Sequence, residues 1–473
     1  MRKGTGKYGR QRCVACLAAL IACVALCAPQ GVAARANSAP MYWEGVTGAG
    51  TQVLTDTCPV LVERERLVFS VPDFPLTEVA QPSAYAACVS AAYTLYNPKD
   101  YTVNVRLAFP FGVVPPYYEF EHAFADGGYS VTVDGQEVQA VLRHTYAYGE
   151  FSTQTDTARL QDDYEIDAFY APDTTVTAYE YTFENIVDGN KRDYAPYASF
   201  YIAPCEDRTR VAASQCNGFS TQKEGVKVGA FVQNGQTATV YAIGQPLAAP
   251  PQWTVYRNGG EKEKIDGNAA LTSVRTCSFE AFALQNYDPD GEVSAVDWYN
   301  AVVESARLHS DVGGYARFDL APTNNLMRWY DYTLSLAALS RCEHVVTAPL
   351  YPLIDGGYSP FKYVYTYLLS PAKGWHSFGA LDIRVQTPYY MLESDGFDFQ
   401  ADEGGFSLSL QTLPDGELSF ALCASQQPQA VRRKESRWWV VGIVLCIGVL
   451  LAAAGGLGVL GYAIYRAAKD SRR

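Results

Sequence analysis

The sequence predicts a mostly β protein with two or more antiparallel β-sandwich units, one short helix and a C-terminal transmembrane helix. Two observations predict the sandwiches. The composition favours strands, with 34 Tyr in 473 residues, and short alternating apolar and polar runs are separated by Gly, Asn and Asp turn signals. The third observation is the uncharged run 438–465 near the C-terminus, which exceeds the roughly 20 apolar residues that a spanning helix needs.

The two ends of the chain predict its location. Residues 1–36 combine basic residues, the apolar stretch 13–28 and a small-x-small cleavage site at 34–36, as in a secretory leader. A lipoprotein cleavage box ending at Cys23 is the alternative interpretation. After a cleaved leader, the apolar run would stop transfer and leave only 466–473 in the cytoplasm. We therefore expect a single-pass protein of the cell membrane, with its N-terminus and its bulk outside.

Strand signals define the first unit and the middle region. Runs at 60–71, 85–96 and 101–109 alternate in the manner of strands, and Asp134-Gly135 predicts a hairpin turn between 129–133 and 137–146. The Tyr-rich middle has further runs at 174–183 and 197–202, and Asn234-Gly235 predicts a hairpin joining 225–232 to 237–243.

A helix opens the last unit. Ser294 is a fitting N-cap for a helix over 294–308, with Asp297 in its first turn. Six strand signals follow it, so the last unit is a second sandwich candidate. These six runs are 329–336, 344–351, 362–369, 378–385, 406–410 and 417–423.

These signals divide the chain into seven segments. They are a signal peptide (1–36), an N-terminal sandwich-like unit (37–150), a Tyr-rich β middle region (151–293), a helix with a C-terminal sandwich-like unit (294–425), a stalk (426–437), the transmembrane helix (438–465) and a cytoplasmic tail (466–473).

Charge and cysteine content bound the partners. The net charge is −13 and the basic residues gather at the two ends, so the acidic middle excludes nucleic acid as an expected partner. Seven of the twelve cysteines lie between the leader and the apolar run, which leaves at least one thiol without an intrachain partner. Cys205 and Cys216 are the favoured disulfide pair. Between the leader and the apolar run there is no C-x-x-C motif, and no His lies near this pair, which disfavours zinc.

One segment, 286–297, resembles a calcium loop. Oxygen ligands at alternate positions, a glycine at the sharp turn and a following helix suit Ca²⁺. The same residues also form a β-turn followed by a helix cap, which explains the pattern without a metal. Calcium therefore stays one of two interpretations, and its candidate ligands are Asn286, Asp288, Asp290, Glu292 and Asp297.

Other patterns suggest a function less directly. The chain has no H-E-x-x-H or G-x-S-x-G motif, so no catalytic residue is predicted. A glycosidase carboxylate pair could be formed by Asp395 with Asp398 or Glu403. Two further patterns have both a functional and a packing interpretation: a sugar-stacking platform (Tyr117, Tyr118, Phe120, Tyr389 and Tyr390) and a small-residue helix face (Gly448, Ala452 and Gly456).

Five segments carry a resemblance to a group of known proteins. The chain resembles exported, membrane-anchored β-rich proteins of Gram-positive bacteria that have no assigned function. The resemblance implies an extracytoplasmic β-sandwich protein and no activity. Its segments are 91–98 (AAYTLYNP), 105–112 (VRLAFPFG), 129–138 (YSVTVDGQEV), 365–375 (YTYLLSPAKGW) and 378–385 (FGALDIRV).

We therefore expect a membrane-anchored surface protein that acts as a binding or structural module, with an extracellular ligand that the sequence does not name. The first alternative is a cell-surface carbohydrate hydrolase. The second is an accessory subunit of a membrane complex that assembles through the small-residue helix face.

Overall fold

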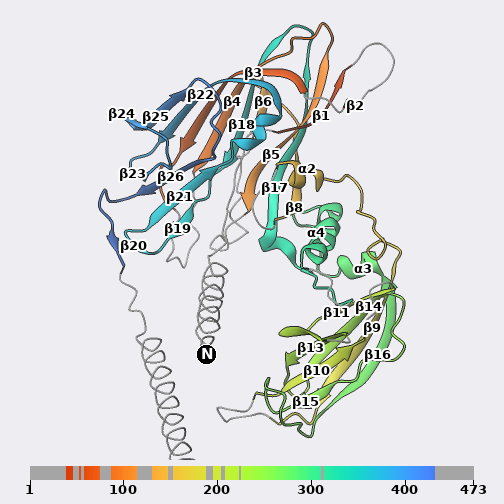
Figure 1. The fold of residues 1–473 in the computed structure, drawn as a ribbon. Helices are drawn as coiled ribbons and strands as arrows, with labels where there is room; N and C mark the ends of the chain where they lie inside the picture. The colour runs from red at the N-terminus through yellow and green to blue at the C-terminus, as the bar shows by residue number, and fades with distance from the viewer. Residues whose placement is uncertain are drawn as a thin grey trace, which may run out of the picture.

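The computed structural model describes residues 39–45, 53–54, 58–74, 87–113, 130–147, 153–187, 195–203, 208–222, 225–309 and 314–431. These residues form two parts, which we call the trunk and the inserted domain (Figure 1). The inserted domain and the helices beside it branch from the trunk between two of its strands. The structure is mostly β, as predicted.

The trunk contains an eight-stranded sheet in the order β24-β25-β22-β3-β4-β18-β6-β7. A five-stranded sheet (β2-β1-β5-β17-β8) and a four-stranded sheet (β19-β21-β26-β23) accompany it, together with the short pair β20-β27. The trunk strands are β1 (Ala39–Gly45), β2 (Val53–Leu54), β3 (Cys58–Ser70), β4 (Cys88–Tyr96), β5 (Val103–Val113), β6 (Ser130–Val133), β7 (Gln136–Glu137), β8 (Val141–Tyr146), β17 (Leu326–Leu336), β18 (Arg341–Pro349), β19 (Leu353–Asp355), β20 (Tyr358–Ser359), β21 (Lys362–Tyr367), β22 (Trp375–Gln386), β23 (Tyr390–Glu393), β24 (Gln400–Asp402), β25 (Gly405–Leu410), β26 (Leu418–Cys423) and β27 (Gln429–Ala430).

Strict alternation along the trunk strands builds one core. In β4 every second side chain is buried, including Val89, Ala91, Tyr93 and Leu95. Because successive side chains of a strand point to opposite faces, this pattern turns one face of the large sheet inward. The core between the sheets joins side chains from β3, β4, β5, β17, β18, β21, β22 and β26.

The trunk corrects the expectation that the units 37–150 and 294–425 are separate sandwiches. β3 pairs in parallel with β22, and β4 pairs with β18, so strands from both predicted units share the large sheet. β5 likewise pairs with β17. All six strands predicted in the last unit do form, in β17, β18, β21, β22, β25 and β26.

The inserted domain is a second sandwich made of two four-stranded sheets, β12-β13-β10-β15 and β11-β14-β9-β16. Its chain leaves the trunk after β8 and returns at β17, and those two strands are paired neighbours. Its strands are β9 (Thr175–Glu184), β10 (Tyr197–Ile202), β11 (Thr209–Ala213), β12 (Gly218–Gln222), β13 (Gly225–Phe231), β14 (Thr237–Gly244), β15 (Thr254–Tyr256) and β16 (Asn268–Ser278).

The two predicted turns differ in outcome. The turn at Asp134 and Gly135 does join β6 to β7, with φ of 49° and 74° at the two residues. The hairpin predicted at Asn234 and Gly235 is wrong. β13 and β14 lie in different sheets, so this turn carries the chain across the sandwich. An N-G turn fixes the local reversal but does not decide which strand pairs with which.

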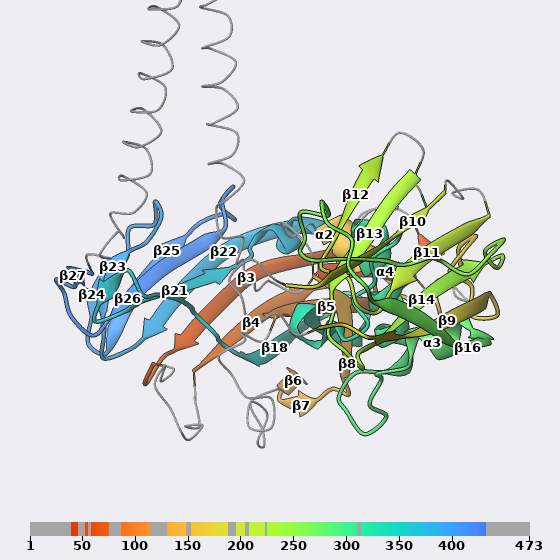
Figure 2. The ribbon, with the colours of Figure 1, turned by 90° about the horizontal axis from the view of Figure 1, so that it is seen from below.

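Helices connect the two parts (Figure 2). Helix α4 (Ala295–Leu308) forms as predicted, and the Ser294 Oγ accepts the Asp297 N–H at 3.0 Å. A core of aromatic and small side chains joins α3 and α4 to β9 and β16. The other helical elements are α2 (Thr153–Ala158), α3 (Phe279–Ala283) and the 3-10 turns η2 (Pro322–Asn325) and η3 (Ser370–Gly374).

The predicted leader, transmembrane helix and cytoplasmic tail lie outside the described residues. Within the described ranges, no helix is both long and apolar enough to span a membrane.

Candidate functional site

The calcium-loop residues separate into two groups in the structure. The first group forms a turn: Asn286 Nδ2 donates to the Leu320 carbonyl at 3.0 Å, and Asp288 Oδ1 accepts the Asp290 N–H at 3.0 Å. The last two candidates, Glu292 and Asp297, instead form ion pairs with arginines. The candidate ligands are therefore shared between a surface turn and a buried ionic network.

That network, which we call the junction network, lies where α4 contacts β8, the strand paired with β17. Arg143 on β8 donates to Asp297 at 2.9 Å and to Asp162 at 2.9 Å. Arg328 on β17 donates to Glu292 at 2.8 Å. Asp297 is only 2% exposed, so its charge depends on Arg143 and on the His144 backbone N–H, which donates at 3.0 Å.

Two further groups complete the junction network. Arg106 on β5 donates to Asp331 on β17 and also to Asp162 at 2.9 Å. The imidazole of His144 lies 3.3 Å from Glu292, between Nε2 and Oε1. The junction network therefore links three neighbouring strands of the trunk to the start of α4.

Ion pairing shifts the pKa values of the side chains in the junction network. The hydrogen bonds from Arg106 lower the pKa of Asp162. Burial opposes ionisation of Glu292, but the contacts with His144 and Arg328 outweigh it and lower its pKa. The hydrogen bonds to Asp331 raise the pKa of Arg106. All three shifts favour the charged forms, as expected of groups that fasten α4 to the trunk.

Within the described ranges, no group of three or more His, Cys, Asp or Glu side chains is placed to hold a metal ion. The calcium hypothesis stays a prediction.

The remaining sequence candidates are dispersed. Asp395, Asp398 and Glu403 are exposed on loops near β24. Tyr389 stacks on Phe74 with ring centroids 3.7 Å apart, as part of the trunk's packing. Three other residues of the predicted aromatic platform, Tyr117, Tyr118 and Phe120, lie outside the described residues.

The described residues include only one cysteine of the predicted Cys205–Cys216 disulfide. Cys205, one of the favoured pair, lies outside the described residues. Cys216 has a free thiol that donates to the Gly218 carbonyl at 3.3 Å. Five other described cysteines are also free, namely Cys58, Cys88, Cys277, Cys342 and Cys423.

The candidate functional site is a pocket of about 440 Å³ at the open edge of the inserted domain. β11 and the start of β12, from opposite sheets, form one side of it. The segment 314–320, on its way from α4 to η2, forms the other. The Val211 N–H donates to the Gly314 carbonyl at 2.7 Å and the Ala316 N–H donates to Val211 at 2.8 Å. An isolated parallel β-bridge between Val211 and Tyr315 thereby holds the segment 314–316 beside β11.

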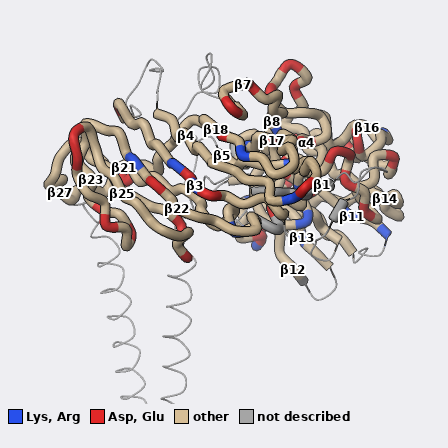
Figure 3. Tube along the Cα trace, turned by 90° about the horizontal axis from the view of Figure 1, so that it is seen from above, with Lys and Arg blue, Asp and Glu red and all other residues tan. Residues whose placement is uncertain are grey.

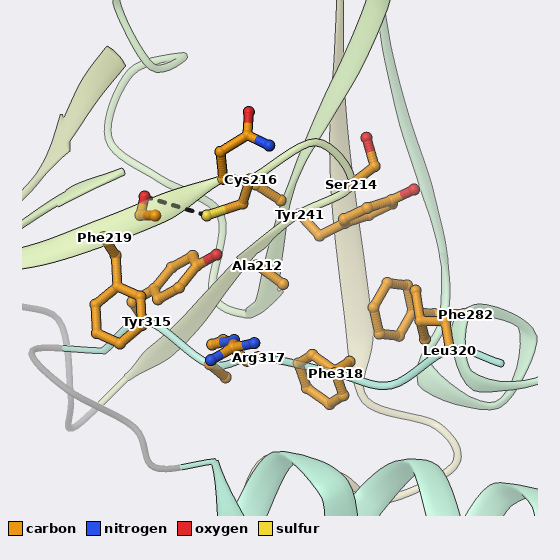
Figure 4. Close-up of a pocket in the computed structure, with 14 residues that line it drawn as sticks. Ala212, Ser214, Cys216, Phe219, Tyr241, Phe282, Tyr315, Arg317, Phe318 and Leu320 are labelled. Atoms are coloured by element: carbon orange, nitrogen blue, oxygen red, sulfur yellow. Dashed lines mark hydrogen bonds between the residues drawn. The ribbon is translucent and has the colours of Figure 1, made fainter. Parts of the chain in front are cut away.

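Aromatic rings line the pocket on both sides of Arg317 (Figure 4). On one side, Tyr315 and Phe219 have ring centroids 5.3 Å apart. On the other, Phe282 lies 4.8 Å from Tyr241 and 5.3 Å from Phe318 between centroids. These spacings are those of aromatic rings packed against one another, so each pair forms part of the pocket wall.

Burial and hydrogen bonding keep the pocket's phenols neutral. Burial, together with the contact between its hydroxyl and Cys216, raises the pKa of Tyr315. Burial also raises the pKa of Tyr241. Arg317 is therefore the only side chain that carries a charge at neutral pH among the described residues lining the pocket.

Sequence reasoning missed this pocket. Its lining comes from β11, β12, β14, α3 and the segment 314–320, which are far apart in the chain. The only local signal is the sequence of 315–318, Tyr-Ala-Arg-Phe, which alternates aromatic and small residues around an arginine.

Comparisons with known proteins leave the family open. No protein-family model matches the chain, and no curated protein is similar to it. One solved structure, from Legionella pneumophila and provisionally named as a nutrient binding protein, is similar over 82% of this chain and 70% of its own. The identity is 10% and the TM-score is 0.32, so the likeness carries no argument about function.

Proposed function

We propose that this chain is a binding module of a membrane-anchored, extracytoplasmic surface protein, and that the pocket beside β11 and β12 holds its ligand. The observation that carries the proposal is the pocket itself. It is concave, and both aromatic rings and polar side chains line it, one of them an arginine. Concave sites of this size are the usual form of small-molecule sites.

The position of the pocket also supports binding. The inserted domain branches from the trunk (Figure 1), and none of the residues that line the pocket belongs to the trunk's core. Sites formed by loops and edges on a rigid scaffold are typical of recognition proteins. The leader and the apolar run in the sequence support an extracytoplasmic placement with one anchor.

A small-molecule screen by thermal shift tests the binding part of this proposal. We expect at least one compound to raise the melting temperature of the protein, because ligand that binds only the native state stabilises it. Ala213→Trp would fill the pocket and abolish that shift. Leu271→Trp, on the exposed surface of β16, is the matched control and should keep it. A screen without any hit, or hits that survive Ala213→Trp, would refute the pocket as the binding site.

The placement is tested separately with a membrane-impermeant lysine reagent on intact cells. We expect the inserted domain to be labelled without lysis, for example at the part-buried but accessible Lys227. Labelling only after lysis would contradict an extracytoplasmic module.

A further inference from the structure

The polar side chains that line the pocket offer a ligand more hydrogen-bond donors than acceptors. Arg317 is exposed and, within the described ranges, has neither an ion pair nor a hydrogen bond. Among the described residues, no Asp or Glu lines the pocket, although the chain has 50 of them, and acidic positions lie on both the trunk and the inserted domain (Figure 3). The pocket is thus locally positive on an acidic protein.

Two further polar side chains of the lining, Asn217 and Ser214, have already used acceptor capacity. The Asn217 Oδ1 accepts the Phe231 N–H at 2.5 Å, which leaves its amide NH₂ as the free group. The Ser214 Oγ accepts the Thr239 N–H at 2.9 Å, which leaves its hydroxyl hydrogen to donate. A guanidinium offers donors only. Together these side chains offer a ligand mainly donors, so a matching ligand must supply acceptors.

The positive charge of Arg317 favours a ligand whose acceptor group is anionic over one whose acceptor group is neutral. A guanidinium bonds a carboxylate or phosphate through two parallel N–H donors, and such bonds are roughly twice as strong as neutral ones. Aromatic rings line the pocket on both sides of Arg317 and can contact a partly apolar body attached to that anion (Figure 4). A neutral ligand would form no ion pair with Arg317, which would stay hydrated, so only the contacts with the rings would contribute to binding.

We infer that the pocket binds an anionic ring compound, in which Arg317 and Asn217 bond the carboxylate or phosphate and the rings flank the body. This inference rests on the proposed binding function and adds the ligand's chemical class. The ring can come from two sources, an aromatic acid or an acidic sugar, which share the anion and differ in the hydroxyls they present.

Two matched pairs of probes test this inference on the purified full-length protein. They are benzoate with benzamide, and glucuronate with glucose, titrated by isothermal calorimetry or ligand-observed NMR. We expect at least one acid to bind at least tenfold more tightly than its neutral partner. Arg317→Gln should weaken that acid at least tenfold and leave the neutral partner unchanged. The acid that binds identifies the source of the ring.

The control for charge is Arg384→Gln, which removes one positive charge from the trunk, in an exposed ion pair far from the pocket residues in the fold. It should leave binding unchanged. Equal binding of acid and neutral partner, no binding of either acid, or an acid unaffected by Arg317→Gln would each overturn the inference. If neutral compounds from the screen bind and Ala213→Trp abolishes their binding, the proposed function stands while the anionic class fails.

Discussion

Two regions of this protein bury ionisable side chains in opposite ways. In the junction network, each buried charge has a partner of opposite sign, as in Arg143 with Asp297 and Arg328 with Glu292. In the trunk core, His344 on β18 is fully buried, and neither of its ring nitrogens has a hydrogen-bond partner within the described ranges. Instead, its ring stacks on Tyr93 with centroids 5.3 Å apart.

The contrast shows that burial alone does not set the state of an ionisable group. Where complementary charges converge, the charged forms persist and fasten α4 to the trunk. Where the group is buried and stacked on aromatic rings, burial lowers the pKa of His344 to about 3 and the imidazole stays neutral. The first region should therefore be sensitive to loss of a partner, and the second to pH.

The largest expected effect is in the junction network. Arg143→Met leaves the buried carboxylate of Asp297 without its main cation, which should lower the free energy of unfolding by about 3–5 kcal/mol. Denaturant unfolding followed by the fluorescence of the buried Trp298 measures this loss. The double variant Arg143→Met/Asp297→Leu should recover part of it, because no unpaired charge then remains. A loss below 1 kcal/mol in the single variant would show that Asp297 is satisfied without Arg143.

The second-largest effect should come from the trunk, where burial of His344 makes the stability depend on pH. The pKa of His344 is about 3 in the folded state against 6.5 for the free side chain, so below pH 6.5 the unfolded chain binds a proton that the folded one does not. The stability that neutral His344 provides is complete above pH 6.5 and is lost as the pH falls toward 3. Between pH 6.5 and 4.5 the loss is roughly 2–3 kcal/mol.

The control for this effect is His344→Phe, which keeps a flat ring between Tyr93 and Tyr332 without a titrating nitrogen. Glu65 and Tyr93 occupy the neighbouring positions on β3 and β4, and any pH dependence from them is common to both proteins. The difference between the two pH–stability curves therefore isolates His344. Parallel curves would mean that His344 is protonated or solvated in the folded state.

A smaller effect concerns the helix that the junction network holds. Ser294→Ala removes the side-chain acceptor for the Asp297 N–H, at a cost of about 1 kcal/mol. Ser294→Asp should retain most of the stability, because Asp is also a good N-cap. Thermal unfolding of the three proteins makes the comparison. If Ser294→Ala and Ser294→Asp destabilise the protein equally, the contacts of α4 with the trunk hold the start of the helix without the cap.

The smallest effect should come from an exposed pair. Arg384 and Asp402 are 2.8 Å apart, with side chains 38% and 31% exposed. Water and salt screen such a pair, so Arg384→Gln should change the free energy of unfolding by less than about 0.5 kcal/mol. Chemical denaturation in low and high salt measures it. A change comparable to that of Arg143→Met would contradict the view that burial, and not pairing itself, sets the size of the effect.

The sequence by itself determined many of the strands and helix α4, although it did not indicate others, such as β16. Alternation predicted β4, β9 and the strands of the last unit, because the two-residue period of a strand records which face is buried. The Ser294 cap predicted the start of α4, because capping involves residues only three apart. These signals are local and are complete within a few residues.

Only the tertiary structure decided which strands pair and what the charges do. β3 pairs with β22 across about 300 residues, and nothing within either strand specifies that partner. Glu292 and Asp297 looked like metal ligands in their own segment, but Arg328 and Arg143 reach them from other elements. The pocket around Arg317 likewise assembles from distant segments. Long-range pairing, ionic partners and concave sites depend on residues that meet only after folding, and a local pattern cannot encode them.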